Sequence, residues 1–196
     1  MYSISSIFPT VLYADSYNGN LFDEYMFCRQ LETITLPEGS MVSINKNVLD
    51  APELSKVKSC LQHALNVYTK EVMNYDCDVY ITQSWVSTQP KGTSLYAHSH
   101  PNSFVSGVIY FTNEGDTPIV FEGKKESIQP TIKQFTPLNS RTWRVSGKKG
   151  GFILFPSSLD HRVERNDHDM DRVSLAFNTF VRGKLGNEDK LNLLEL

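Results

Sequence analysis

The sequence has few cysteines and no long apolar run, and both absences narrow the kind of protein it can encode. Its three cysteines, Cys28, Cys60 and Cys77, lie far apart and form no C-x-x-C pair. That usage argues against a disulfide framework or a thiolate metal site and suits a reducing compartment. No apolar stretch approaches the length of a membrane span, and the first residues lack the basic start of a secretory signal. We therefore expect a cytoplasmic protein.

An excess of basic charge is also missing. The formal net charge is −3 and the isoelectric point is about 5.9, with Lys and Arg scattered along the chain. Without a basic stripe we expect neither a nucleic-acid nor a membrane partner, but a small-molecule or a peptide or protein substrate. The 196 residues suffice for one domain with a sizeable core, so we expect a single domain over residues 1–196. The oligomeric state stays open.

The hydrophobic periodicity changes near residue 78. Before it, residues 6–13 predict a short edge strand interrupted by Pro9, and residues 21–34 have the spacing of an amphipathic helix. A stronger helical stripe covers residues 50–73, where Asp50 stands three residues before Glu53 as a variant of the capping box. We expect residues 1–77 to support a sheet from outside.

After residue 78 the chain alternates short apolar strands with turn residues. Because no helical pattern separates these strands, the fold class is mainly β with flanking α-helices, a sandwich or jelly roll, rather than an α/β sheet. Residues 78–183 would form its core and residues 184–196 a C-terminal tail. The expected strands are Val79–Ser87, Ser94–His98, Phe104–Thr112, Ile119–Phe121, Trp143–Val145, Phe152–Phe155, His161–Glu164 and Val173–Arg182.

Three histidines are the best candidates for a metal site. His98 and His100 stand two residues apart, so in an extended segment their side chains share a face. His161 follows a distant, buried-looking strand and could supply a third ligand. Three imidazoles from two strands can take three cis positions on a divalent metal and leave others open. The alternative for each is an ordinary surface or hydrogen-bonded core histidine.

A second candidate group follows His161. Arg172 and Ser174 alternate with Val173 and so point to the same face, which Ala176 and Asn178 continue. An arginine on the inner wall of a barrel needs a partner, because an unpaired buried guanidinium is very costly. The carboxylate of a small molecule would serve, held by the guanidinium and the hydroxyl. The alternative partner is an internal Asp or Glu.

Several blocks of this sequence resemble one group of enzymes. These 2-oxoglutarate/iron(II) oxygenases occur in phage and bacterial genomes and are distantly similar to prolyl 4-hydroxylases. Because the similarity continues outside the candidate site, it covers most of the chain. The similar blocks inside the site are residues 92–103, 106–111, 154–161 and 172–178, and those outside it are residues 48–54, 81–85 and 183–186.

The resemblance implies a cupin-like double-stranded β-helix and an enzyme of the dioxygenase class. Fe(II) would be held by His98, His100 and His161, which makes them the catalytic residues. Arg172 and Ser174 would grip the distal carboxylate of 2-oxoglutarate, with O₂ as the other co-substrate. The products would be succinate, CO₂ and a hydroxylated substrate, with a peptidyl proline or another amino-acid residue as candidates. A phage-encoded member would act in the host cytoplasm.

The sequence offers further candidate residues and leaves alternative functions open. Tyr110 and Asn178 are additional candidates for binding the co-substrate, although Tyr110 could equally belong to the barrel core. His100 occupies a position where the superfamily usually has Asp or Glu. Either it ligates and alters the metal preference, or it does not ligate, and water or a carboxylate such as Asp160 or Glu122 takes its place. Two other classes remain: a three-His cupin-type metalloenzyme that ignores 2-oxoglutarate, and a non-catalytic metal-binding jelly roll. Residues 123–140 could form a lid or a plain surface connection.

Overall fold

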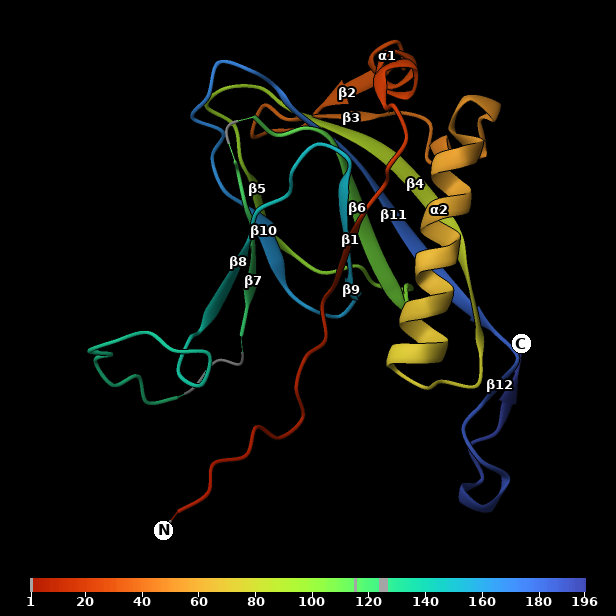
Figure 1. Ribbon diagram of the computed structural model, residues 1–196, viewed down its shortest axis with the longest axis vertical. Coiled ribbons are helices and arrows are strands. Elements are labelled where there is room, and N and C mark those ends of the chain that lie inside the picture. Colours follow the sequence, from red (N-terminus) through yellow and green to blue (C-terminus); the bar gives the residue numbers. More distant parts are fainter. Residues whose placement is uncertain (1, 115, 124–126) are drawn as a thin grey trace.

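Two antiparallel sheets face one another in the computed structural model, which describes residues 2–114, 116–123 and 127–196 (Figure 1). The larger sheet contains, in spatial order, β1 (Tyr13–Ser16), β9 (Gly151–Pro156), β6 (Val105–Thr112), β11 (Arg172–Arg182), β4 (Asp78–Gln89), β3 (Met41–Ser43) and β2 (Thr33–Thr35). The smaller sheet contains β5 (Leu95–His98), β10 (His161–Val163), β7 (Ile119–Glu122) and β8 (Thr142–Val145). A separate pair, β12 (Lys184–Leu185) and β13 (Leu194–Glu195), ends the chain.

Helices cover the outer face of the larger sheet (Figure 1). They are α1 (Phe22–Arg29) and α2 (Ser55–Asn66), which continues into a π-helical segment, η3 (Val67–Val72). Short 3₁₀ turns are η1 (Val48–Asp50), η2 (Pro52–Leu54) and η4 (Glu188–Lys190). Among the described residues, no helix is both long and apolar enough to cross a membrane.

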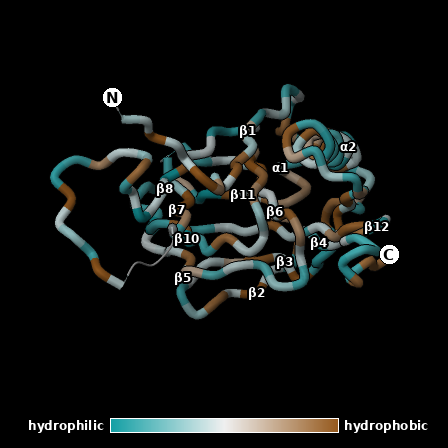
Figure 2. The backbone as a smooth tube through the Cα atoms, turned by 90° about the horizontal axis from the view of Figure 1, so that it is seen from below, coloured by the Kyte–Doolittle hydropathy of each residue, from teal (hydrophilic) through white to brown (hydrophobic). Residues whose placement is uncertain are grey.

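The larger sheet is buried on both faces, and the alternation of its central strands separates two apolar cores. Ile109 and Phe111 of β6 join the side chains of α2 on the outer face, while Val108 and Tyr110 point between the sheets. The inner core also takes Phe121 from β7 and other apolar side chains of β9 and β10. Figure 2 shows hydrophobic residues along these inner strands. One face of β6 therefore anchors the helices, and the other lines the space between the sheets.

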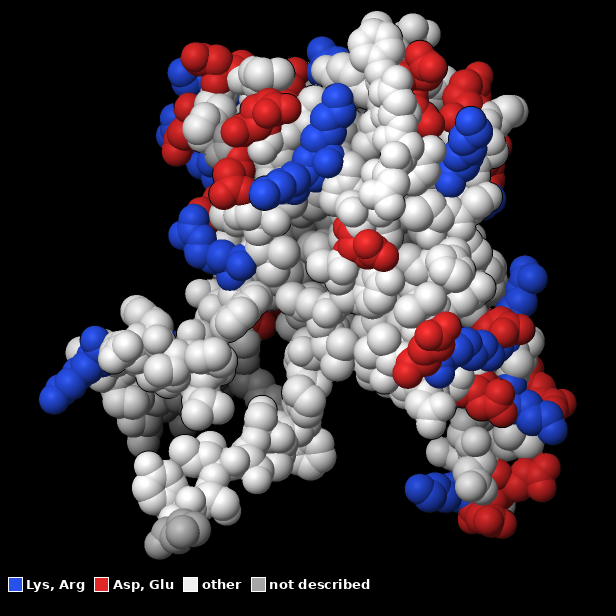
Figure 3. All heavy atoms as spheres, viewed as in Figure 1, with Lys and Arg blue, Asp and Glu red and all other residues white. Residues whose placement is uncertain are grey.

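The jelly-roll expectation is confirmed, and each strand expected after residue 78 is present within about two residues of its expected bounds. On the helix-packed face of β11, Val173, Leu175 and Phe177 are buried as the alternation predicted. Charged side chains of both signs are interspersed on the face seen in Figure 3. The segment from β4 to β11 is thus the part of the chain that its sequence pattern described best.

The expected edge strand at residues 6–13 is wrong in position. The chain forms a strand only from Tyr13 to Ser16, where β1 pairs with β9 along the edge of the larger sheet. Residues 6–12 include Pro9, which has no N–H to donate to a ladder, and Phe8, whose φ of 55° is incompatible with a strand. The edge position itself is correct.

The two helices also differ from expectation. Residues 50–54 form 3₁₀ turns, α2 begins only at Ser55, and no side chain caps it, so the capping box at Asp50 is wrong. Instead, the Asp50 carboxylate accepts a hydrogen bond from Lys58 at 2.7 Å. The helix expected over residues 21–34 ends at Arg29, because the β-branched run from Thr33 to Thr35 forms β2. The β2–β3 hairpin was not predicted.

Candidate metal centre

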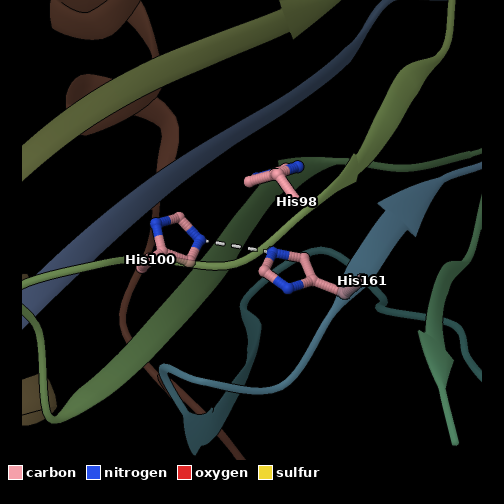
Figure 4. Close-up of side chains that lie close together, drawn as sticks. All are labelled: His98, His100 and His161. Atoms are coloured by element: carbon pink, nitrogen blue, oxygen red, sulfur yellow. Dashed lines mark hydrogen bonds between the residues drawn. The ribbon is translucent and has the colours of Figure 1, made fainter.

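Three imidazoles converge at the mouth of the space between the sheets (Figure 4). His98 is the last residue of β5, His100 lies two residues beyond it, and His161 opens β10 directly opposite His98. The candidate ligand nitrogens of the three rings all lie within 4.8 Å of one another. The Nε2 atoms of His100 and His161 are 3.2 Å apart. The strand pairing thus brings together histidines that are remote in sequence.

Backbone carbonyl groups orient two of the rings. The Nδ1 of His98 lies 2.8 Å from the Tyr96 carbonyl oxygen, and the Nδ1 of His161 lies 2.9 Å from that of Leu159. A proton on each Nδ1 makes these contacts hydrogen bonds and leaves Nε2 with a free lone pair. Metal-binding histidines are commonly oriented in this way, by a hydrogen bond from the nitrogen that does not ligate.

Burial keeps the rings of His100 and His161 neutral. Burial, together with the smaller effects of the neighbouring His161 and His98, lowers the pKa of His100 to about 4. Burial also lowers the pKa of His161 to about 4, against the opposing effect of the hydrogen bond to Leu159. At neutral pH both imidazoles therefore carry the lone pair that a metal ion requires.

No carboxylate takes part in this cluster among the residues that the structure describes. Asp160 is exposed, and Glu122 accepts a hydrogen bond from Nε of Arg162 at 3.1 Å on the smaller sheet. The three-His set is consequently the group available for a cation. Three neutral imidazoles fit a divalent transition metal, whereas Mg²⁺ and Ca²⁺ prefer oxygen ligands.

A cavity of about 210 Å³ opens beside the histidines, and Arg172 lies in its wall. The arginine side chain is buried, with 2 % of the residue exposed. Its Nη1 donates to Oε1 of Gln89 at 3.1 Å and to Oγ of Ser174 at 3.2 Å. Its Nε and Nη2 have no hydrogen-bond partner, and no ion pair to an acid forms within the described chain. The alternative of an internal Asp or Glu partner is therefore wrong.

Two hydroxyl groups near this guanidinium are also without partners. The Arg172 guanidinium carbon lies 5.0 Å from the centroid of the Tyr110 ring, and the buried Tyr110 hydroxyl has no hydrogen bond. Burial raises the pKa of Tyr110 and the Arg172 charge opposes that shift. Oγ of Ser87, on β4 opposite Ser174, is likewise unpartnered. These groups can all donate, so together they fit a small carboxylate better than a cation.

A comparison with known sequence families finds one similarity, and it lies in the jelly-roll part of the chain. Residues 83–178 match the family described as "Putative 2OG-Fe(II) oxygenase". The matched segment runs from β4 to β11 and contains the three histidines and Arg172. The jelly-roll part of the chain is thus similar to the 2OG-Fe(II) oxygenase family. No curated protein sequence gives a significant match.

Solved structures of 2OG-Fe(II) oxygenases share this fold. A prolyl-4-hydroxylase from Pseudomonas putida is 14% identical with a TM-score of 0.58, over 86% of this chain and 92% of that chain. HygX from Streptomyces hygroscopicus, crystallised with nickel, 2-oxoglutarate and hygromycin B, is 14% identical with a TM-score of 0.60, over 87% and 82%. An oxidoreductase of the 2OG-Fe(II) oxygenase family from Burkholderia pseudomallei is 12% identical with a TM-score of 0.57, over 80% and 75%. At such identities the likeness establishes the fold.

Asn178 lies outside the cavity that Arg172 and Ser174 line. Its Oδ1 accepts a hydrogen bond from Oγ of Ser106 at 2.9 Å, and its Nδ2 lies 3.3 Å from Oε1 of Gln83. Ser106 also bonds to Ser157, whose backbone carbonyl oxygen accepts from the backbone N–H of His100 at 2.9 Å. Asn178 is thus connected, through Ser106 and Ser157, to the backbone of the loop that carries His100.

The sequence pattern missed three polar residues of the cavity region. Gln89 and Ser87 could have been found, because they alternate on β4 and their register with β11 sets them opposite Arg172 and Ser174. Glu38 lies on the unpredicted β2–β3 hairpin, and no spacing pointed to it. For the segment 123–140, residues 124–126 lie outside the described residues, and none of its described residues lines the cavity.

Proposed function

We propose that this protein is a 2-oxoglutarate- and Fe(II)-dependent dioxygenase that hydroxylates an unactivated C–H bond. One observation carries the proposal. The buried guanidinium of Arg172, with two unpartnered nitrogens, lines the same cavity as the three convergent histidines. A buried cation without an acid partner is costly unless an anionic ligand binds it. A dicarboxylate beside a divalent metal meets both requirements.

Each residue has a distinct role in this proposal. His98, His100 and His161 hold Fe(II) as neutral ligands, and together with 2-oxoglutarate and O₂ the metal supplies an oxidant for C–H bonds, releasing succinate and CO₂. Arg172 and Ser174 bind the distal carboxylate of the co-substrate. Tyr110 and Ser87 offer further hydrogen bonds to that carboxylate. A charged hydrogen bond of this kind is shorter and stronger than a neutral one, and the fork of the guanidinium fixes the orientation of the bound carboxylate.

The surrounding wall excludes water from the reacting groups. Val108, Ile119, Phe155 and Val163 line the cavity and are buried. Their apolar side chains strengthen the electrostatic attraction between Arg172 and a bound carboxylate, because the effective dielectric constant is lower there than in water. Because all three protein ligands are neutral, the co-substrate would supply the negative charge that balances the metal. Metal and co-substrate should accordingly bind in a strongly coupled manner.

The candidates for the prime substrate come only from similar proteins. The Pseudomonas putida relative is named a prolyl-4-hydroxylase, and HygX was crystallised with hygromycin B. A peptidyl proline, another amino-acid residue or a small metabolite are therefore the candidates for this chain. Fold alone does not choose among them.

Anaerobic titration of the Fe(II) protein with 2-oxoglutarate tests the proposal. We expect a visible charge-transfer band that saturates at one co-substrate per chain, and stoichiometric succinate when O₂ is admitted with a substrate. The absence of a band at saturating 2-oxoglutarate would refute it. An unchanged spectrum together with metal-dependent oxygen consumption would instead identify a three-His enzyme that does not use 2-oxoglutarate.

That second function is favoured by one observation: in the part of the chain that the structure describes, no carboxylate joins the candidate ligands. A three-His centre of the cupin type would oxidise or isomerise its substrate without forming succinate. Product analysis separates the two reactions directly. A coordination sphere closed entirely by protein ligands would instead indicate a structural, non-catalytic site, because a catalytic metal keeps a position open.

A further inference from the structure

The buried polar atoms without hydrogen-bond partners all gather around one cavity. Within the described part of the chain they are Ser87 Oγ, Tyr110 OH, Nε and Nη2 of Arg172, and Oε1 of Glu38. Glu38, Ser87 and Arg172 line the cavity, and the Tyr110 ring stacks on Arg172. Buried groups of this kind are rare in folded proteins and call for an explanation in each case. Their grouping indicates that bound molecules complete the cavity.

Glu38 differs chemically from the other members of this group. The hydroxyls and the guanidinium can all donate to a carboxylate, whereas an ionised glutamate only accepts. A dicarboxylate co-substrate held by Arg172 cannot satisfy the Glu38 oxygen, because the two negative groups repel. The Glu38 carboxylate is therefore available to accept a hydrogen bond from a molecule other than the co-substrate.

The backbone fixes Glu38 at the rim of the cavity. Glu38 lies in the tight turn between β2 and β3, in which the N–H of Gly39 donates to the carbonyl oxygen of Leu36 at 2.9 Å. Gly39 follows with a φ of +90°, a conformation that favours glycine. Oγ of Ser40 then donates to the carbonyl oxygen of Ser94 at 3.2 Å, just before β5. The turn is held at both ends, so the backbone from which the Glu38 side chain extends is positioned before a ligand arrives.

Aromatic rings line the same cavity beside the metal ligands. Trp85 and Tyr96 belong to its wall together with Glu38. The Trp85 ring centroid lies 5.8 Å from that of His100, and the Tyr96 ring centroid lies 6.1 Å from that of His98. The face of an aromatic ring attracts a cation, and tryptophan does so most strongly. One carboxylate and two rings favour a positively charged group over a neutral hydroxyl.

We infer that Glu38 is a specificity residue that binds an ammonium or guanidinium group of the prime substrate. Glu38 is the only carboxylate among the described residues of the cavity wall, and Arg172, its only side chain with a fixed positive charge, is used by the co-substrate. The substrate class is therefore an amine or guanidine, either a basic amino-acid residue or a cationic small molecule. This inference rests on the proposed oxygenase function for the identity of the reacting metal, but the binding of the cation does not depend on it.

A pair of probes of similar size tests the inference. Nα-acetyl-lysine amide and Nα-acetyl-norleucine amide have the same four-carbon side chain and differ by a terminal ammonium in place of a hydrogen atom. Their affinities are measured by anaerobic calorimetry on the protein loaded with Fe(II) and 2-oxoglutarate. We expect the wild type to bind the lysine probe about tenfold or more tightly, the size of one charge-assisted hydrogen bond. Glu38→Gln should bind both probes equally.

Glu32→Gln is the matched control, because Glu32 is an exposed glutamate next to β2 and outside the cavity wall. It should keep the preference for lysine. Equal binding of the two probes by the wild type overturns the inference whether or not the variant folds. A weaker affinity of Glu38→Gln for 2-oxoglutarate, with the probe preference intact, would also overturn it. A lysine preference in a protein that shows no 2-oxoglutarate band would sustain the cation site and refute the oxygenase proposal instead.

Discussion

His98 and His161 are direct partners across the antiparallel pair of β5 and β10, and their ring centroids lie 4.5 Å apart. The pairing changes register immediately afterwards, since Val163 faces Leu95. Such an irregularity re-aims the side chains next to it and is common beside functional sites. The convergence of the imidazoles thus depends on the register of one short strand pair, in which a slip by one residue would turn His161 to the opposite face.

Arg172→Gln should abolish tight binding of 2-oxoglutarate and leave metal binding intact. Removing one member of a buried charged pair costs about 2–5 kcal/mol, so the dissociation constant should rise by roughly 30-fold or more. Calorimetry with 2-oxoglutarate and metal analysis of the same sample measure both effects. Arg182→Gln is the control, because Arg182 is an exposed arginine on the same strand. Equal affinities for 2-oxoglutarate in the two variants would contradict the assigned role.

His100→Ala should weaken Fe(II) binding by at least about tenfold, since even residues that only support metal ligands commonly contribute that much. His100→Asp should restore binding, because it introduces the carboxylate that is usual in the superfamily. Competition with a coloured chelator gives both constants. His63→Ala, at an exposed position on α2, serves as the control. Unchanged metal affinity in His100→Ala would remove His100 from the ligand set.

The metal-free protein should lose stability as the pH falls from 6.5 towards 4. The folded-state pKa values of His100 and His161 are lowered to about 4, so in this window the unfolded chain binds more protons. His161→Asn removes one imidazole with a lowered pKa. The free energy of unfolding should then fall less on acidification, by on the order of 2 kcal/mol. Urea denaturation in EDTA at pH 7 and pH 4.5 measures the difference. Superimposable pH profiles of wild type and variant would show that His161 titrates normally.

Tyr110→Phe should have opposite effects on stability and on binding. It removes a buried hydroxyl without a partner, so the apo protein should be as stable as the wild type or more stable by about 1–2 kcal/mol. The affinity for 2-oxoglutarate should fall by about tenfold if that hydroxyl donates to the carboxylate. Denaturation and calorimetry report the two effects.

Tyr68→Phe provides the matched comparison for that variant. The Tyr68 hydroxyl donates to the carbonyl oxygen of Val11 at 3.2 Å, far from the cavity wall. Its removal should lower stability by about 1 kcal/mol and leave 2-oxoglutarate binding unchanged. If both variants are destabilised alike and neither affects the co-substrate, Tyr110 is an ordinary core residue.

Local patterns made most of the jelly roll predictable. From β4 to β11 the strands are short, apolar and separated by turn residues. The local sequence pattern is therefore enough to predict them. The alternation of side chains along a strand also predicted that Arg172 and Ser174 lie on one face. The N-terminal part was harder, because Pro9, the 3₁₀ turns before α2 and the small β2–β3 hairpin depend on what they pack against.

By itself the sequence determined the residue types of the site and the faces of the strands on which they lie, because side-chain alternation is a local property of an extended chain. Only the tertiary structure decided that Arg172 has Gln89, and no acid from the described residues, beside it, since such a contact joins two strands through their register. The position of Glu38 was decided in the same way, by the docking of a distant hairpin on the chain before β5.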